Sequence, residues 1–285
     1  MLAGNGPRAG EAPMADEAKS ISPKLSATKD APNANSKINR IIAVVSGKGG
    51  VGKSTVSSML ACALRRQGKR VGIMDADVTG PSIPKAFGVH DRLMGDMDGN
   101  IVLPTSALGI PMISTNLMLD NPSQAVAWRG PVVSGVLKQF FSETNWGELD
   151  YLVVDMPPGT SDVALTIFQS LPVDGIIVVT SPQDLVEMIV DKAIDLATNM
   201  HVPVLGIVEN MASFECPDCG KVHYLFGEPK GAQLAAERGI PAYATLPINP
   251  QFAALADAGR VEECVADEAL APIVEQIAAI RYDFE

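Results

Sequence analysis

Short apolar runs alternate along the chain with segments in which apolar residues recur three and four positions apart. The apolar runs, rich in Val and Ile, predict strands at residues 41–46, 70–75, 151–155, 175–180, 203–209 and, more weakly, 241–246. The periodic segments predict helices at residues 53–67, 132–143, 184–200, 251–258 and 271–281. Strands that alternate with helices favour a single α/β domain built on a doubly wound, mostly parallel sheet.

Two regions lack this alternation. Residues 1–38 are rich in Ala, Pro, Ser, Asn, Gly and Lys and have no hydrophobic period, so we expect a disordered tail before a folded domain at 39–285. Residues 78–125 contain many Pro, Gly and Asp residues, and within them the segments 100–104 and 110–115 could pair as a hairpin.

The most informative stretch is Gly47-Lys48-Gly49-Gly50-Val51-Gly52-Lys53-Ser54-Thr55, which lies between the first predicted strand and the first predicted helix. It matches the phosphate-binding pattern G-x-x-x-x-G-K-[ST] at every fixed position. Glycines let backbone N–H groups converge on phosphate oxygens, and the helix start adds partial positive charge. Lys53 is expected to neutralise the β- and γ-phosphates, and Ser54 to ligate Mg²⁺. The alternative is a glycine-rich turn without a ligand.

Lys48 is a second lysine in this loop, and the sequence alone allows it to be an ordinary solvated charge. However, the loop resembles the deviant Walker A motif of the MinD/ParA/nitrogenase-iron-protein class of ATPases. In that class the first lysine reaches the nucleotide of the partner subunit. The resemblance therefore implies a P-loop ATPase that binds ATP at the interface of a homodimer, with Lys48 acting across that interface.

Two predicted strands lead into carboxylates, at Asp77 and Asp155, where open α/β sheets bind ligands. Asp155 is expected to hold the Mg²⁺ shell and Gly159, in the turn that follows, to sense the γ-phosphate; a rigid Pro-Pro-Gly turn is the alternative. The resemblance gives Asp77 the role of positioning the attacking water, against a turn residue or helix cap. It also gives Asn210 a contact with adenine, against an ordinary turn asparagine.

Cys216 and Cys219 form a C-x-x-C pair, which in a cytosolic enzyme is more typical of metal or redox chemistry than of a structural disulfide. Tetrahedral zinc and four-iron clusters usually need four ligands, and the chain offers no convincing third or fourth. His223 is expected to be a surface or packing residue, and Cys62 and Cys264 to be structural. A two-fold axis near the pair would supply four thiolates. Structural zinc and a thioredoxin-like pair are alternatives.

Composition restricts the partners. The chain has 22 basic and 33 acidic residues, and this net charge of −11 argues against binding to nucleic acid or an anionic membrane. No apolar run approaches the roughly 18–20 residues that span a bilayer. The N-terminus lacks the apolar core of a signal peptide, so we expect a cytoplasmic protein.

Together the motifs are similar to those of the Mrp/ApbC family of iron–sulfur cluster carrier ATPases, over about residues 40–260. They are the P-loop, Asp75-Ala76-Asp77, Trp128-Arg129-Gly130-Pro131, Asp155-Met156-Pro157-Pro158-Gly159-Thr160, Glu209-Asn210-Met211 and Cys216-x-x-Cys219. The resemblance implies ATP binding, slow hydrolysis and a labile four-iron four-sulfur cluster. Cys216 and Cys219 would bridge that cluster between two protomers, which would pass it to apo iron–sulfur proteins. The chain lacks the N-terminal cysteine cluster of eukaryotic relatives.

The alternative function is that of a MinD/ParA-like positioning or partition ATPase. Membrane-targeting members of that group need a basic amphipathic helix at the C-terminus, and residues 261–285 are acidic. DNA-binding members need a basic face, which the net charge opposes. The C-x-x-C pair has no role in either activity.

Overall fold

The structure is a computed structural model that describes residues 29–97, 99–119, 128, 130–159, 162–182 and 186–280. The expected tail therefore lies outside the described residues up to position 28. Arg129 and Thr160, which belong to two of the motifs above, also lie outside them, as do the first two residues of the helix expected at 184–200. None of the helices in the described ranges is long and apolar enough to cross a membrane.

Seven strands of the described chain form one sheet in the order β13-β10-β9-β2-β8-β3-β6, and every neighbouring pair is parallel. The strands are β2 (Ile41–Ser46), β3 (Val71–Asp75), β6 (Met112–Ile113), β8 (Tyr151–Asp155), β9 (Gly175–Thr180), β10 (Val204–Glu209) and β13 (Ala242–Thr245). Parallel neighbours need crossover connections, which the intervening helices supply. The doubly wound α/β fold expected from the sequence is confirmed.

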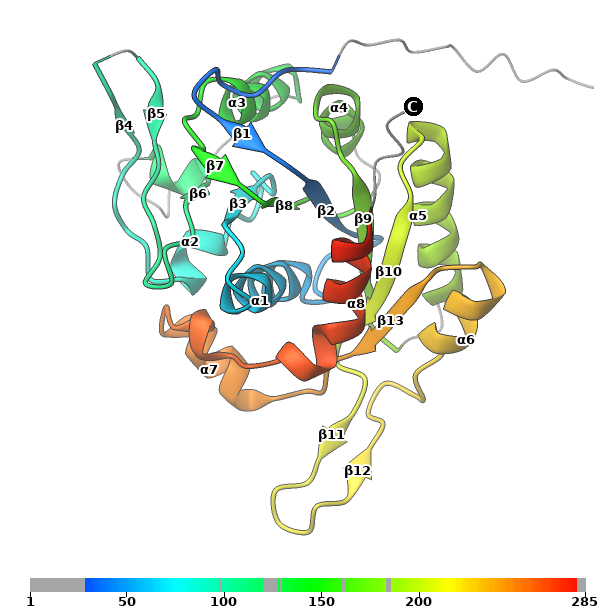
Figure 1. Ribbon diagram of the computed structural model, residues 1–285. Helices are drawn as coiled ribbons and strands as arrows, with labels where there is room; N and C mark the ends of the chain where they lie inside the picture. Colours follow the sequence, from blue (N-terminus) through cyan, green and yellow to red (C-terminus); the bar gives the residue numbers. More distant parts are fainter. Residues whose placement is uncertain are drawn as a thin grey trace, which may run out of the picture.

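Helices cover both faces of this sheet (Figure 1). One face carries α1 (Lys53–Arg66), α2 (Ile83–Ala86), α7 (Pro250–Asp257) and α8 (Asp267–Ala279), with the short 3-10 turns η1 (Thr115–Leu117) and η2 (Val261–Glu263). The other face carries α3 (Gly130–Ser142), α4 (Asp162–Ser170), α5 (Val186–Met200) and α6 (Gly231–Glu237). Each face therefore has its own hydrophobic core.

The central strand β2 contributes to both cores. Ile42 and Val44 belong to the core beneath α1, whereas Ile41 and Ala43 belong to the core on the opposite face. Successive side chains of a strand point to opposite faces, so a strand covered on both sides is apolar at every position. This explains the uninterrupted apolar run that leads into the P-loop.

Three short strand pairings in the described part of the chain lie outside the main sheet. β11 (Phe214–Glu215) pairs antiparallel with β12 (Val222–His223), β4 (Met94–Gly95) pairs antiparallel with β5 (Ile101–Val102), and β1 (Lys37–Ile38) pairs parallel with β7 (Glu148–Leu149). β1 falls within the expected tail, and the backbone N–H of Asp30 donates to the Ser170 carbonyl at 2.7 Å. Residues 29–38 thus contact the domain through backbone hydrogen bonds that composition does not reveal.

The hairpin expected between residues 100–104 and 110–115 is confirmed only near its turn. An antiparallel bridge joins Thr105 and Pro111, and the Met112 backbone N–H donates to the Pro104 carbonyl at 3.1 Å. Met112 and Ile113 are fully buried, and they extend the main sheet as β6, parallel to β3. This segment therefore forms the edge of the main sheet in addition to its local pairing.

Candidate nucleotide site and cysteine hairpin

The P-loop connects β2 to α1 at the carboxyl end of the sheet. Gly50 and Gly52 both have a φ of 82°, in the left-handed region where a glycine meets no steric penalty. Gly52 is the N-cap of α1, and a Cβ atom there would lie 2.2 Å from the Asn210 side-chain nitrogen. The first turn of α1 contains no acidic residue. The first turn of α1 therefore presents no negative side chain that would compete with an anion for the positive end of the helix.

The side chain of Lys53 is buried beside two carboxylates. Its side chain is 6% exposed, and its ammonium nitrogen lies 2.8 Å from Asp155 Oδ2 and 3.8 Å from Asp77 Oδ2. A buried lysine needs such partners, because an unpaired charge away from water is costly. Lys53, Asp77 and Asp155, predicted separately from three motifs, are thus brought together.

Asp155, at the end of β8, is fully buried and accepts two hydroxyl hydrogen bonds. The Ser54 hydroxyl donates to its Oδ2 and the Ser57 hydroxyl to its Oδ1, each at 2.6 Å. A hydroxyl beside a carboxylate is an oxygen donor set of the kind that Mg²⁺ takes, so Ser54 and Asp155 fit the ion they were predicted to hold. Ser57 was not predicted from the sequence, although it lies one helical turn after Lys53 and so on the same face of α1.

Asp75 and Asp77 differ sharply despite their spacing. Asp75 is buried, and it accepts hydrogen bonds from the Ser114 hydroxyl at 3.0 Å and the Ser82 backbone N–H at 3.1 Å. Burial, with the nearby Asp155 charge, raises the pKa of Asp75 to about 7. Asp77 is 14% exposed and accepts from the Thr79 hydroxyl at 2.8 Å. Asp77 therefore keeps an open carboxylate beside Lys53, while Asp75 anchors the loop after β3.

The remaining predicted nucleotide residues surround the loop. Lys48 is half-buried near its start. Gly159 has a φ of 77°, and its N–H donates to the Ser46 carbonyl at 2.8 Å, which joins the turn after β8 to the end of β2. The Asn210 side-chain amide donates to the Val51 carbonyl at 2.9 Å. Both residues thus contact the loop or the strand that leads into it.

A pocket of about 280 Å³ opens beside the loop. Gly52 and Thr55 form its wall on the P-loop side, and Asn210 forms part of the wall at the end of β10. The rest of its lining is largely apolar and comes from α1, α7 and the segments after β10, β12 and β13; it includes Met59, Met211, Phe226, Leu246, Pro247, Ile248 and Phe252. Its position next to a phosphate-binding loop and its apolar lining fit the base of a nucleotide.

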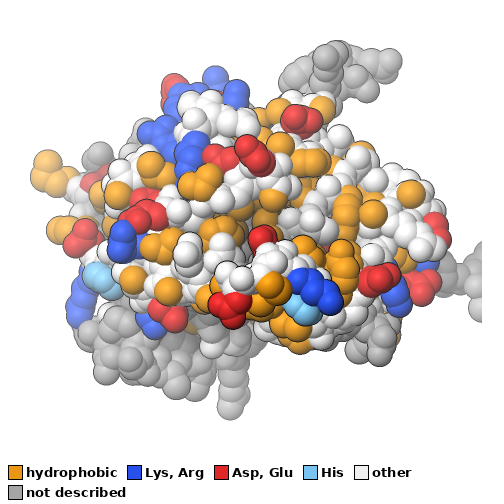
Figure 2. Space-filling view, turned by 90° about the horizontal axis from the view of Figure 1, so that it is seen from below, with side chains coloured by type: hydrophobic (Ala, Val, Ile, Leu, Met, Phe, Trp, Pro, Cys, Tyr) orange, Lys and Arg blue, Asp and Glu red, His pale blue; other side chains and the backbone are white. Residues whose placement is uncertain are grey.

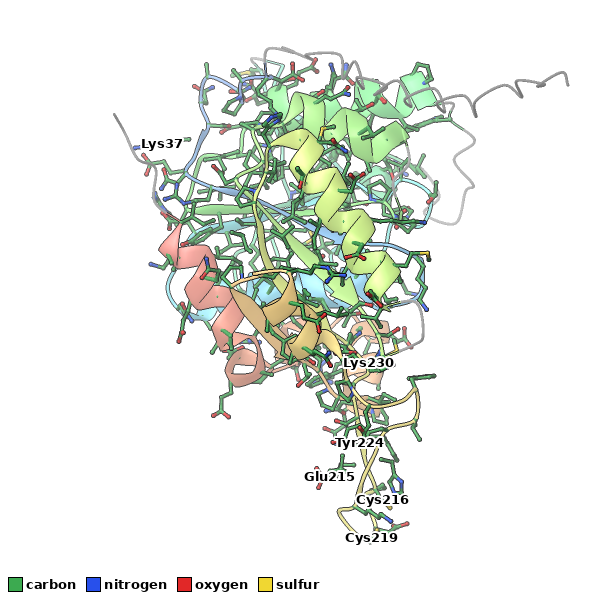
Figure 3. All side chains as sticks on the ribbon, turned by 90° about the vertical axis from the view of Figure 1, so that its right-hand side faces the viewer. Lys37, Glu215, Cys216, Cys219, Tyr224 and Lys230 are labelled. Carbon is green, nitrogen blue, oxygen red and sulfur yellow. The ribbon has the colours of Figure 1, made fainter. Side chains whose placement is uncertain are left out.

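Cys216 and Cys219 lie on the turn of the β11–β12 hairpin, which projects from the domain (Figures 1 and 3). Cys216 is half-buried and Cys219 exposed. The Cys216 backbone N–H donates to the Lys221 carbonyl at 2.9 Å, and the Gly220 N–H donates to the Cys216 carbonyl at 2.9 Å. Backbone hydrogen bonds from Asp218 and Cys219 lower the pKa of the Cys216 thiol, which favours the thiolate that binds metal.

The hairpin brings together two thiols but not four. Within the described ranges, no group of three or more His, Cys, Asp and Glu side chains could hold a metal ion. His223 is exposed on β12. Cys62 and Cys264 are fully buried in the core beneath α1, and burial raises the pKa of both thiols, to about 12 for Cys62. The burial expected for Cys62 is thus confirmed, and Cys264 lies in the same core.

Figure 2 looks at the molecule from the side on which this hairpin projects. Hydrophobic side chains are spread over this face, and acidic and basic side chains form small groups among them. The hairpin itself carries exposed apolar residues after the cysteines, namely Val222, Tyr224, Leu225 and Phe226.

Known proteins are similar in sequence to this chain over most of its length. The chain is 45% identical to the iron–sulfur cluster carrier protein of Clostridium perfringens over 244 residues, which cover 83% of this chain and 86% of that protein. It is 40% identical to the cytosolic Fe-S cluster assembly factor Nubp2 homolog of Anopheles gambiae, covering 86% and 98% of the two chains.

Solved structures agree with this relationship. The nucleotide-binding protein of Archaeoglobus fulgidus, solved in complex with ADP and with cobalt found in it, is 43% identical; the match has a TM-score of 0.73 and covers 81% of this chain and 90% of that chain. The cell division ATPase MinD of Pyrococcus furiosus is 21% identical, with a TM-score of 0.58 and coverage of 84% and 98%, and so shares the fold. The sequence model of the protein family described as NUBPL iron-transfer P-loop NTPase matches residues 37–281 of this chain. The chain therefore belongs to the NUBPL iron-transfer P-loop NTPase family.

Proposed function

We propose that this P-loop NTPase is an ATP-dependent iron–sulfur cluster carrier that works as a homodimer. The observation that carries the proposal is the pair of thiols, Cys216 and Cys219, at the tip of a hairpin whose base meets the nucleotide pocket. Relatives at 39–45% identity that are named iron–sulfur cluster carriers support it. A MinD-like positioning role would leave these projecting thiols without a function.

ATP is held at the P-loop. Lys53 exchanges its contact with Asp155 for the β- and γ-phosphates, and the N–H groups of residues 47–55 surround the phosphate oxygens. Ser54 and Asp155 would hold Mg²⁺, which would neutralise charge on the phosphates. Asn210 sits beside the base, and Gly159 senses the γ-phosphate when its backbone N–H exchanges the Ser46 carbonyl for a phosphate oxygen.

Hydrolysis uses two further residues. Asp77 orients the attacking water, since its carboxylate is partly open to solvent and is held beside Lys53. Lys48 reaches the nucleotide of the partner subunit, so complete catalytic machinery requires the dimer. Lys48 thus ties turnover to the assembled dimer, whereas Asp77 acts within its own chain.

The cargo is a four-iron four-sulfur cluster. Two hairpins related by a two-fold axis supply four thiolates, the number that such a cluster requires. An exposed site on projecting turns leaves the cluster accessible, which favours its transfer to apo iron–sulfur proteins in the cytosol. Nucleic acid is not a partner in this scheme, in keeping with the net charge of −11 and the mixed charges of the face seen in Figure 2.

Anaerobic reconstitution with iron and sulfide tests the proposal. The wild-type chain should develop the broad visible absorption of an iron–sulfur cluster and pass it to an apo-ferredoxin. The Cys216→Ala/Cys219→Ala variant should bind ATP and form no cluster, and the matched variant Cys62→Ala should behave like wild type. A cluster retained by the double variant contradicts the proposal. Tight zinc binding without a reconstitutable cluster would instead assign the cysteines to a structural zinc site.

A further inference from the structure

The two legs of the cysteine hairpin both begin at the wall of the 280 Å³ pocket. The entering leg leaves β10 through Asn210 and Met211, which line the pocket. The returning leg passes through Phe226, seven residues after Cys219, and Phe226 lines the same pocket. Both legs of the hairpin that carries the thiols therefore start at the pocket that fits a nucleotide base.

The entering leg is fastened to the other side of this pocket by backbone hydrogen bonds. The Ala212 N–H donates to the Leu246 carbonyl at 2.9 Å, and the Ile248 N–H donates to the Ser213 carbonyl at 2.7 Å. Leu246 and Ile248 both line the pocket. Met211 has a φ of 59°, which is uncommon for a residue other than glycine and marks a constrained turn at this point. The entering leg is thus held by its backbone.

The returning leg is fastened further along the chain. The buried carboxylate of Glu209 accepts from the Gly231 N–H at 2.8 Å and from the Tyr243 hydroxyl at 2.7 Å. Figure 3 shows Lys230 where this leg rejoins the domain, and Tyr224 between that point and the cysteines. Between the anchor at Gly231 and the cysteines, Phe226 is the residue of this leg that lines the pocket.

Phe226 differs from its neighbours Tyr224 and Leu225 in that it lines the pocket. All three residues are about half-exposed, and Phe226 is 44% exposed. A large aromatic ring left half-exposed at the edge of a pocket can gain contact area when a planar base enters. Bases stack well on aromatic side chains, whatever their identity.

We propose that Phe226 is a positioning residue through which the base of the bound nucleotide fixes the cysteine hairpin. This inference rests on the proposed nucleotide site. A base that enters beside Thr55 and Asn210 packs against Phe226, and this contact restricts the returning leg and so the turn that holds Cys216 and Cys219. Because the contact exists only with the base present, ATP binding favours one placement of the thiols over others.

Thiol labelling in the full-length protein, free of iron and zinc, tests this inference. Cys216 and Cys219 are alkylated with a maleimide, with and without saturating ATP, Mg²⁺ present, and labelling at each cysteine is followed by peptide mass spectrometry. Wild type should show at least about a threefold change in labelling rate on adding ATP, as expected if ATP shifts the populations of two hairpin placements. Inorganic triphosphate, which lacks the base, should compete with ATP for the P-loop and leave the labelling rate unchanged.

The variants identify the residue. In Phe226→Ala, ATP affinity should fall about tenfold, within the range for loss of one base–aromatic contact. At saturating ATP the labelling rate of this variant should no longer depend on nucleotide. Leu225→Ala, the matched neighbour, and Phe226→Tyr, which keeps the ring, should both retain the wild-type response.

Three results would overturn the inference: a wild-type labelling rate that ATP does not change, a Phe226→Ala variant that keeps the full response, or triphosphate acting like ATP. These failures can be told apart from failure of the proposed function. If ATP binds and a cluster forms while labelling is insensitive to ATP, only the coupling through Phe226 is wrong. If wild type does not bind ATP at all, the nucleotide site itself is wrong.

Discussion

The ammonium group of Lys53 lies 2.8 Å from a carboxylate oxygen of Asp155, and both side chains are buried. The same oxygen of Asp155 accepts the Ser54 hydroxyl at 2.6 Å. The ammonium group that we propose for phosphate binding and two oxygens that we propose as Mg²⁺ ligands thus satisfy one another. In this proposal, nucleotide binding exchanges these contacts for contacts of similar kind, so the buried charges of the site stay paired.

Lys53→Ala should weaken ATP binding by about 10- to 100-fold, the size expected for losing hydrogen bonds to charged groups. Equilibrium titration with a fluorescent ATP analogue measures this. Lys48→Ala, in the same loop, is the matched control and should bind with near wild-type affinity. Because removing Lys53 also leaves Asp155 without its cation, urea unfolding must show that the variant is folded. Unchanged affinity in a folded Lys53→Ala variant would contradict the P-loop assignment.

Asp77→Asn should retain ATP binding and lose turnover by about 10²- to 10⁴-fold, the usual contribution of a general base. The substitution is nearly isosteric and keeps the acceptor for the Thr79 hydroxyl, so the loop after β3 should be preserved. Release of phosphate at saturating ATP is the measurement. Hydrolysis at the wild-type rate would exclude Asp77 as the residue that orients water.

Lys48→Ala should lower turnover more than affinity, because we place its function in the partner's site. Mixing this variant with Asp77→Asn gives the sharper measurement. A mixed dimer of these two contains one active site with the wild-type Asp77 of one chain and the wild-type Lys48 of the other. Recovery of hydrolysis on mixing is expected. If dimers form and no activity returns, Lys48 acts within its own chain or has another role.

The four cysteines should separate into two reactivity classes. Burial raises the pKa of Cys62 to about 12, so at pH 8 its thiol is almost wholly protonated and unreactive. The pKa of Cys216 is instead lowered by backbone hydrogen bonds, so its reactivity should reach its plateau at a lower pH than that of a free thiol. Alkylation of metal-free protein across pH 6–9 should modify Cys216 and Cys219 first. Early modification of Cys62 would contradict the burial described here.

The fold was largely predictable, because its signals are local. Strands buried on both faces appear as continuous apolar runs, and the glycines of the P-loop appear as a fixed pattern between a strand and a helix. The carboxyl ends of neighbouring parallel strands lie at one edge of the sheet, so the sequence alone predicts that Asp77 and Asp155 belong to one site.

The remaining features depend on contacts between distant segments. Met112 and Ile113 form a sheet edge because of what buries them, which the punctuated sequence around them does not indicate. The hydroxyl of Ser114 donates to Asp75, which lies 39 positions earlier in the chain. Phe226 lines the same pocket as residues of the P-loop, although it lies far from them in sequence. Of the residues missed, Ser57 alone carried a sequence signal, its spacing of one helical turn from Lys53.

Native mass spectrometry of the anaerobically reconstituted full-length chain tests most directly the claim that one cluster is carried between two hairpins. Each chain contributes Cys216 and Cys219, so we expect a species of two chains with a single cluster, about four irons in all. Removing the cluster with a chelator should remove that species in the absence of nucleotide. A cluster held by one chain, or a dimer that carries two clusters, would contradict the account.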